Sequence, residues 1–244
     1  MVAVQDADLD SGWVWYRPTA DEEASVSLRD VTVRPLLAAR PSRTFVWYKG
    51  QKNYMGSYWS ATARHHLVYE SRNELAHLLC ADFCRSVTRI VTQPFCIYVR
   101  IKGRLRHHTP DFLLLDDGAA VVVDVTNPER LHDPKVAFVL TWTAQVMEHL
   151  HWRYDVLTTV PSTRLENVRY LAGYRRDWLI NPDILAELRS RADDLVGRSL
   201  SDVYLASHPD ALVRPALLHM LWNQELTVDL DTVLSSTMVL GGPP

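Results

Sequence analysis

Two aspartates near the middle of the chain have the residue type and the spacing of a metal-binding pair. Asp111 and Asp124 flank two short apolar runs, and the pair Asp117-Gly118 separates those runs. An Asp-Gly pair between apolar runs is the strongest short-range signal for a β-hairpin. With Asp117 and Gly118 as the turn residues, counting outward along both strands places residue 111 directly opposite residue 124. The two carboxylates are therefore expected to project from one face, with Cβ atoms roughly 4.5–5.5 Å apart.

Two facing carboxylates repel each other, and a divalent cation removes that penalty. Proteins hold Mg²⁺ through one or two carboxylates together with water and substrate phosphates, and the ion polarises the phosphate and lowers the pKa of a bound water. The hairpin is thus a candidate site for metal-assisted phosphoryl chemistry. The alternative is that Asp111 and Asp124 are ordinary strand-end carboxylates whose register differs by a bulge.

A third carboxylate is expected from a helix that precedes the hairpin. Ser71 and Glu74 form the S-x-x-E pattern of a capping box at a helix start. Glu70 lies one turn before Glu74, so both glutamates could point toward a common site. The simpler alternative is that Glu74 only closes the capping box. Gln93, just before Pro94, could contact a phosphate or satisfy the edge of a strand.

The elements that must position these residues are predicted from periodicity. Apolar residues at helical spacing follow Ser71, and Val87–Val91 and Phe95–Ile101 have the pattern of strands. Asp133-Pro134 is typical of an N-cap and a first helical residue, and a further strand is expected over Tyr154–Leu157. Helices placed before and after these strands predict an α/β fold with a mixed sheet.

The pattern changes twice along the chain, which predicts three parts. Residues 1–45 are polar and irregular, with a strand expected at Val31–Leu37, and are interpreted as an accessory N-terminal arm. Residues 46–176 form the α/β domain, which begins with an aromatic and basic block of short strands. Residues 177–244 form a small C-terminal domain.

Short helices followed by a strand pair predict that this C-terminal domain is winged-helix-like. Helices are expected to begin at Asn181, Ser199 and Pro209, and Leu226–Leu230 alternates like a strand. Winged helices often read DNA. From residue 181 onward, however, the chain has nine acidic residues and four arginines, a net charge of −5 within a total of −3. A duplex-binding surface normally supplies several cations, so we expect a partner-docking domain instead.

Cationic residues are densest between Arg85 and His108. A basic loop of this kind is expected to hold the phosphate backbone of DNA without reading its sequence. His107 and His108 either contribute to that contact or are simply exposed. The residues assigned to DNA are Gln93, Arg100, Lys102, Arg104, Arg106 and His108.

The rest of the composition indicates a cytoplasmic protein. Apolar runs are all shorter than the roughly 18 residues that span a bilayer, and the N-terminus lacks the pattern of a signal peptide. We therefore expect no membrane partner. Cys80, Cys84 and Cys96 show no CxxC spacing and are interpreted as reduced core residues rather than zinc ligands.

Five short motifs, in this order, resemble one known family. They are Y-E-S-x-x-E at 69–74, Q-P-F at 93–95, H-x-P-D-F at 108–112, D-V-x-x-P at 124–128 and D-P-K at 133–135. With these motifs the chain resembles the TnsA-like endonuclease subunits of heteromeric transposases, which are similar in core to type IIS restriction nucleases of the PD-(D/E)xK superfamily. The resemblance extends from W-Y-K-G-Q at 47–51 to L-W-N-Q-E-L-T-V-D-L at 221–230.

The resemblance implies a restriction-endonuclease-like mixed sheet flanked by helices, so that residues 46–176 would be a nuclease domain. It implies that Glu74, Asp111 and Asp124 are the catalytic acids and hold Mg²⁺, with Mn²⁺ as a substitute. It also implies a hydrolase that cuts one DNA strand at each transposon end, while a partner transposase cuts and joins the other and an AAA+ ATPase acts as regulator. Double-stranded DNA and these two proteins are the expected partners, and assembly as a homodimer stays open.

One residue departs from the family pattern. A lysine is expected two residues after the second acid, on the same strand face, and Thr126 occupies that position. Threonine cannot offset charge in the transition state as a cation does, and losing one such group typically costs on the order of 100 to 1,000 in rate. Lys135 is the nearest substitute, although we favour an exposed first-turn residue there. The alternative function is therefore a catalytically impaired nuclease fold that binds DNA and recruits transposase or ATPase partners.

Overall fold

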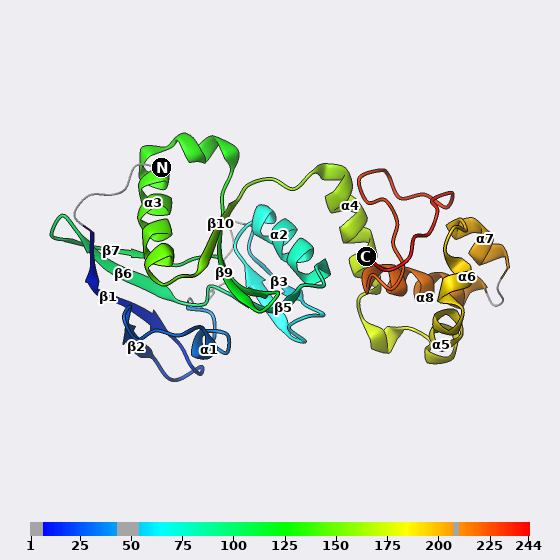
Figure 1. Ribbon diagram of the computed structural model, residues 1–244, viewed down its shortest axis with the longest axis horizontal. Helices are drawn as coiled ribbons and strands as arrows, with labels where there is room; N and C mark the ends of the chain where they lie inside the picture. The colour runs from blue at the N-terminus through cyan, green and yellow to red at the C-terminus, as the bar shows by residue number, and fades with distance from the viewer. Residues whose placement is uncertain (1–6, 43–53, 207–209) are drawn as a thin grey trace. The chain divides into compact units, whose positions relative to one another are not determined.

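The computed structural model describes residues 7–42, 54–206 and 210–244 (Figure 1). Two compact units divide the chain: unit 1 comprises residues 1–78 and 86–159, and unit 2 comprises residues 79–85 and 160–244. The boundary predicted at 176/177 therefore differs from the observed one at 159/160. Helix α4 (Ser162–Leu171) belongs to unit 2 because it packs against the long helix α8 (Asp210–Trp222) of that unit. The predicted motif at 47–51 lies outside the described residues.

Unit 1 is built on three sheets. The sheet orders are β2-β1-β6-β7, β10-β9-β8-β5 and β3-β4, and the second is mixed because β10 runs parallel to β9 while the other neighbours are antiparallel. The strands are β1 Ala7–Tyr16, β2 Ala24–Ser27, β3 Gly56–Trp59, β4 His66–Tyr69, β5 Val87–Thr92, β6 Cys96–Ile101, β7 Arg104–His108, β8 Phe112–Asp116, β9 Ala119–Val125 and β10 Arg153–Leu157. The fold is α/β, as predicted, with the expected strands at β5, β6 and β10.

The N-terminal residues form part of this fold. Strand β1 pairs with β2 on one side and with β6 on the other, so these residues complete a sheet instead of forming an accessory arm. The strand predicted at Val31–Leu37 is wrong: Val33–Leu36 forms the short helix α1. Pro35 stands within the first turn of α1, where its missing N–H costs little, and Leu36 is fully buried.

The predicted hairpin is confirmed in its register. Asp116 pairs with Ala119 and Phe112 with Val123, so Asp117 and Gly118 are the two turn residues. Both have positive φ, 47° and 77°, as a type I′ turn requires. The ladder ends at the pair Phe112 and Val123. The Asp111 N–H donates to the Val123 carbonyl at 3.0 Å, so the direct pairing of Asp111 with Asp124 that regular counting predicts is not observed.

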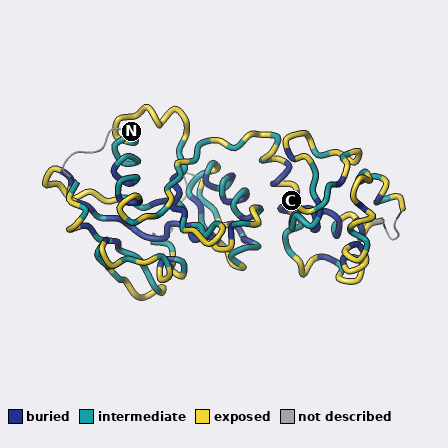
Figure 2. Tube along the Cα trace, in the orientation of Figure 1, coloured by how far each residue is buried: buried dark blue, intermediate teal, exposed yellow. Residues whose placement is uncertain are grey.

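Two helices flank the strands of unit 1. Helix α2 (Arg72–Phe83) begins after Ser71 and is shared between the units, and α3 (Pro134–His149) follows the 3₁₀ turn η1 (Pro128–His132). Asp133 caps α3 as predicted, since its carboxylate accepts the Lys135 N–H at 2.8 Å. Both four-stranded sheets and α3 contribute to one hydrophobic core (Figure 2), which includes Val14, Ile97, Val99, Leu113, Val122, Trp142, Val146 and Met147.

Unit 2 consists mainly of short helices. They are α4, α5 Pro182–Ser190, α6 Ala192–Leu195, α7 Leu200–Leu205 and α8, with the 3₁₀ turns η2 Ala172–Tyr174 and η3 Asp177–Leu179. The predicted N-caps Asn181 and Ser199 are confirmed. The strand predicted at Leu226–Leu230 is wrong. Thr227 makes an isolated bridge with Gly241, and residues 236–240 hydrogen-bond to the residues around the start of α7.

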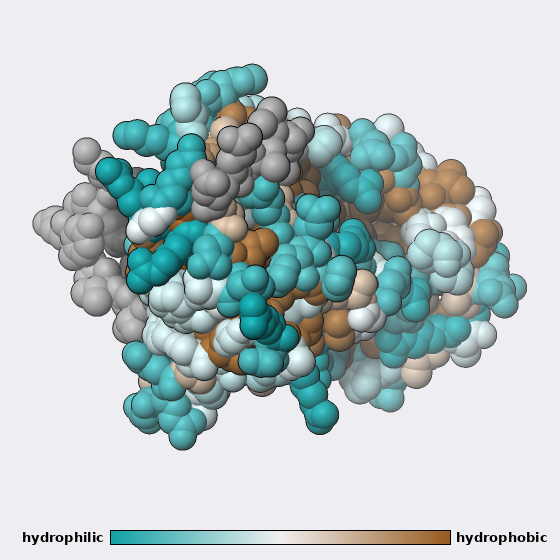
Figure 3. All heavy atoms as spheres, turned by 60° about the vertical axis from the view of Figure 1, so that its left-hand side comes forward, coloured by the Kyte–Doolittle hydropathy of each residue, from teal (hydrophilic) through white to brown (hydrophobic). Residues whose placement is uncertain are grey.

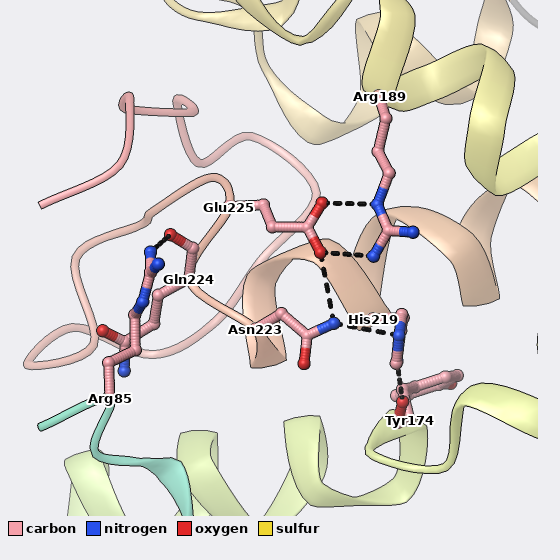
Figure 4. Close-up of polar contacts among 7 residues, drawn as sticks. All are labelled: Arg85, Tyr174, Arg189, His219, Asn223, Gln224 and Glu225. Carbon is pink, nitrogen blue, oxygen red and sulfur yellow. Dashed lines mark hydrogen bonds and ion pairs between the residues drawn. The ribbon is translucent and has the colours of Figure 1, made fainter. Parts of the chain in front are cut away.

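A polar network ties α5 and α8 to the turn that follows α8 (Figure 4). The Arg189 guanidinium donates two hydrogen bonds to the Glu225 carboxylate, at 2.7 and 2.6 Å. Asn223 donates to the same carboxylate at 3.2 Å and contacts the buried His219 ring at 2.9 Å. The other ring nitrogen of His219 lies 2.7 Å from the Tyr174 carbonyl oxygen. Glu225 is thus a partly buried acid that is paired with an arginine.

Hydrophilic residues cover much of the face shown in Figure 3, with hydrophobic residues exposed in separate groups. In the part of the chain that the structure describes, no helix is long and apolar enough to cross a membrane. Of the three cysteines, Cys96 is buried, Cys80 is partly buried and Cys84 is exposed. The prediction of core burial is therefore wrong for Cys84, which lies just beyond the end of α2.

Candidate functional site

Asp111 stands where three strands of the mixed sheet come together. It lies one residue before β8, and its N–H donates to the Val123 carbonyl on β9 at 3.0 Å. Its carbonyl accepts the Gln93 N–H, just after β5, at 2.8 Å. The Asp111 carboxylate in turn accepts the Val125 N–H at 2.7 Å. The backbone on both sides of the hairpin therefore fixes this side chain.

Two glutamates reach the same region from the start of α2. The Glu74 N–H donates to the Ser71 hydroxyl at 3.1 Å, which is the helix cap that the sequence predicts. The Glu74 carboxylate, 9% exposed, accepts the Glu70 N–H at 2.7 Å. The Glu70 carboxylate accepts a hydrogen bond from the Gln93 side-chain amide, also at 2.7 Å. Glu74 thus fixes the turn before α2, and Gln93 links Glu70 to the end of β5.

The ionisation of Asp111 indicates how closely these acids gather. Burial raises the pKa of Asp111 most, the negative charges of Glu74, Asp124 and Glu70 raise it further, and the result is a pKa of about 8. The hydrogen bond from the Val125 N–H lowers the pKa but does not outweigh these effects. A carboxyl group with such a pKa lies in a negative potential that a bound cation would relieve.

Asp124 is the most buried of the acids and is held from two sides. It is 4% exposed, and the His108 Nε2 lies 2.9 and 2.8 Å from its two oxygens. The Tyr154 hydroxyl donates to the same carboxylate. Burial and the charge of Asp124 raise the pKa of Tyr154, so that its hydroxyl remains a donor. The His108 ring packs edge-on against Trp142 of α3, with centroids 6.1 Å apart. Asp124 is therefore oriented by side chains from β7 and β10.

The donor set fits a hard cation such as Mg²⁺, because it consists of buried carboxylates that repel one another. Within the described ranges, no three acidic, histidine or cysteine side chains already converge on one point. Mg²⁺ requires only one or two carboxylates, with water and substrate phosphate completing its shell. The raised pKa of Asp111 is the observation that favours such an ion here.

The position expected for a lysine is part of the backbone framework. The Thr126 N–H donates to the Leu157 carbonyl at 2.9 Å, and its carbonyl accepts the Asn73 side-chain amide at 3.1 Å. Lys135 is exposed at the start of α3, and no ion pair joins its side chain to another described residue. The structure therefore places Thr126 beside the acids and Lys135 at the surface.

The residues assigned to DNA fall into two groups. Arg100, Lys102, Arg104 and Arg106 are exposed on the hairpin of β6 and β7. Its turn is formed by Lys102 and Gly103, both with positive φ. Gln93 and His108 belong with the acids instead, since Gln93 is 4% exposed and bonded to Glu70, and His108 contacts Asp124.

Sequence reasoning missed Tyr154, Asn73 and the contact between His108 and Asp124. Strand β10 pairs in parallel with β9 so that Val156 stands opposite Asp124. Tyr154, two residues earlier, therefore faces the same side of the sheet as Asp124. The residue alternation was visible in the sequence, but the register of the two strands was not.

No family model matches the chain, and no curated protein matches it either.

Proposed function

We propose that this chain is a Mg²⁺-dependent DNA endonuclease subunit of a heteromeric transposase, with a restriction-endonuclease-like core, that cuts one strand at each transposon end. The observation that carries the proposal is the group of buried acids at the end of the hairpin, where neighbouring carboxylates help to raise the pKa of Asp111 to about 8. Phosphodiester hydrolysis is the chemistry that such a site serves best, because a bound divalent ion there can meet a phosphate oxygen.

In this proposal, Glu74, Asp111 and Asp124 hold Mg²⁺ or, as a substitute, Mn²⁺. The ion, when bound, supplies Lewis acidity toward the scissile phosphate and acidifies a water. The chain's own residues do the positioning. The Val125 N–H orients Asp111, while His108 and Tyr154 orient Asp124. Removing a residue that orients a metal ligand in this way typically lowers metal affinity or activity 10- to 100-fold.

The exposed cations of the β6–β7 hairpin would hold the backbone of double-stranded DNA without reading its sequence. Sequence preference would come from the transposase partner. Unit 2, with twelve acidic and nine basic residues in the sequence, would serve as the winged-helix-like docking domain for that partner or for an AAA+ ATPase regulator. Assembly as a homodimer and residence in the cytoplasm complete the proposal.

A second function is favoured by one residue. Thr126 stands where a catalytic lysine is expected, and its backbone groups are bonded to Leu157 and Asn73. A nuclease fold without that cation would bind DNA and recruit partners but cut slowly or not at all. The two functions differ in whether the parent chain hydrolyses DNA.

Plasmid nicking in Mg²⁺ or Mn²⁺, with and without the cognate partners, distinguishes them. The parent should nick, and Asp111→Asn should lose at least about 100-fold in rate because one charge that holds the ion is removed. Asp117→Asn is the matched control, since it removes a carboxylate from the exposed turn of the same hairpin and should nick like the parent. An Asp111→Asn variant that nicks at the parental rate contradicts the nuclease proposal. The scaffold function is supported if the parent and Asp111→Asn both fail to nick the plasmid while Thr126→Lys nicks it.

A further inference from the structure

Unit 1 contains a cavity of about 750 Å³ with a basic wall. The wall brings together α1 and the residues after it, the start of β4 and the end of β5. Five of its side chains are arginines or histidines, and no aspartate or glutamate is among the described residues that line it. The basic side chains are Arg34, Arg40, His65, His66 and Arg89.

The three arginines come from separate parts of unit 1. Arg34 lies on α1, Arg40 follows α1, and Arg89 lies on β5. Among the described residues, none of the three forms an ion pair with a carboxylate. Convergent cations repel one another, and an anion bound between them removes that repulsion. The wall is thus complementary to negative charge.

A buried hydroxyl in the same wall also lacks a partner. Thr92 is 2% exposed and lines the cavity, and its Oγ1 makes no hydrogen bond. Most buried polar side chains in proteins are hydrogen-bonded, so an unpartnered one requires an explanation. A ligand oxygen in the cavity would complete the bonding of Thr92.

We propose that this cavity binds phosphate groups of a nucleic-acid strand. Guanidinium groups match phosphate oxygens in charge and geometry, which favours phosphate over other anions. The described lining includes no tyrosine, tryptophan or phenylalanine, and its arginines favour contact with the phosphate backbone. Thr92 is followed directly by Gln93, and Leu67 in the wall precedes Glu70 by three residues. A strand held here would lead along β4 and β5 toward the acids.

Phosphate binding itself follows from the cavity alone, whereas the identity of the strand as the DNA to be cut rests on the proposed function. The test is the affinity of the full chain for a labelled oligonucleotide, single-stranded or duplex, in EDTA, so that no cleavage occurs. Arg34→Gln combined with Arg89→Gln should weaken binding at least 10-fold. The slope of log affinity against log salt should become shallower by roughly one to two, because each lost phosphate contact removes somewhat less than one counterion.

Arg29→Gln is the matched control, because Arg29 is an exposed arginine of the same unit that pairs with Asp10 outside the cavity. Thr92→Val, which keeps the shape of the side chain, should weaken binding about 3- to 10-fold and gives a second test should the double variant unfold. Inorganic pyrophosphate and a nucleoside triphosphate serve as competitors. Weak competition by both, with loss of oligonucleotide binding in the variants, supports the proposal.

Two results overturn it. One is a loss of oligonucleotide affinity in the double variant and in Thr92→Val that is no larger than in Arg29→Gln. The other is unchanged oligonucleotide binding in the variants together with lost nucleoside triphosphate binding, which would assign the cavity to a free nucleotide. A chain that binds the strand in EDTA but never nicks it in Mg²⁺ refutes the nuclease and leaves the phosphate site standing.

Discussion

Two partly buried acidic residues, one in each unit, have pKa values shifted in opposite directions. Burial is the largest influence on Glu225 and raises its pKa, but hydrogen bonds from Arg189 and Asn223 and the charge of Arg189 outweigh it, so that the pKa lies below its usual range. Burial also acts most strongly on Asp111, but there the neighbouring charges are negative and the pKa rises to about 8. Burial raises the pKa of both groups, so the difference comes from the charges of their neighbours.

Glu225 is paired with a cation, whereas the neighbours that shift the pKa of Asp111 most are negatively charged. Glu225 has its cation within the chain, at 2.6 Å, and the pair joins α5 to the turn after α8. The Asp111 carboxylate accepts the Val125 N–H, the Glu74 carboxylate accepts the Glu70 N–H, and Asp124 contacts His108. Groups of acids in which one pKa is strongly raised are often functional sites. The contrast leads to five predictions.

The largest effect is expected when a cation is introduced beside the acids of unit 1, as Arg189 stands beside Glu225 in unit 2. Thr126→Lys places an ammonium group beside Asp124, on the same strand face, and should raise the nicking rate on the order of 100- to 1,000-fold if the lysine is the missing electrostatic group. Single-turnover nicking in Mg²⁺ measures it. Thr126→Met, of similar length but without charge, is the control. Equal rates in both variants would mean that charge at this position is irrelevant.

The pH dependence of stability should differ between the two acids. The pKa of Asp111 rises on folding from 3.8 to about 8, so the folded protein holds a proton that the unfolded chain releases between these values. Its contribution therefore makes the metal-free protein less stable as pH rises from about 4 to about 8. Asp111→Asn should remove this slope and raise the melting temperature at pH 8, by about 2–4 °C for each kcal/mol recovered. Mg²⁺ should stabilise the parent at pH 8 more than the variant.

Glu225 should make the protein more stable as pH rises, whereas Asp111 makes it less stable. Glu225→Gln should therefore remove a loss of stability that occurs at acidic pH. The lowered pKa of Glu225 means that its contribution is present above its ordinary pKa of 4.5 and is lost on acidification. Melting curves of the parent and both variants between pH 4 and pH 9 provide the measurement. If the melting temperatures of the parent and of Asp111→Asn change with pH in the same way, Asp111 ionises normally and does not differ from Glu225 as described.

Loss of a residue that orients Asp124 should have a smaller effect. Tyr154→Phe keeps the ring and removes the hydroxyl that donates to Asp124, so Mn²⁺ affinity should fall about 10-fold while the protein stays folded. Calorimetric titration with Mn²⁺ checks it. Tyr170→Phe removes a hydroxyl that accepts from Arg214 in unit 2 and should leave Mn²⁺ affinity unchanged. Equal affinity in all three proteins would leave Tyr154 without a role in the site.

The smallest effect is expected where the acid is already compensated. Arg189→Met removes the cation of Glu225, but Arg189 is nearly half exposed, so solvent screening limits the loss of stability to about 1 kcal/mol. The pKa of Glu225 should rise, and nicking should stay at the parental rate. Thermal melting and the plasmid assay together test this. A large loss of nicking would mean that unit 2 contributes to the reaction.

Local features of both regions could be predicted from the sequence. The Asp117-Gly118 turn, the Asp133 cap and the Asn181 and Ser199 caps depend on hydrogen bonds and dihedral angles within a few residues, so the residue types specify them. The same local rules failed at Val31–Leu37, where a strand was expected and a short helix forms around Leu36. Burial of Leu36 in the core prevailed over local propensity there.

The partners of the acids could not be predicted in this way. His108 and Tyr154 reach Asp124 from strands whose pairings with distant segments are not written in any short motif. The same holds for Arg34 and Arg89, which are far apart in the chain and line one cavity. Each of these contacts depends on the register between strands, and a shift of one residue would turn every side chain of a strand to the opposite face.

The order of residues was thus enough to place two aspartates at the open end of one hairpin and a glutamate at a helix start, because periodicity and turn chemistry act over short distances. Tertiary structure decided that these acids would be buried together, that Asp124 would be held by two side chains from other strands, and that Glu225 would have its own arginine. The reason is physical: ionisation depends on the dielectric surroundings and on charges brought close by folding, and neither exists in the extended chain.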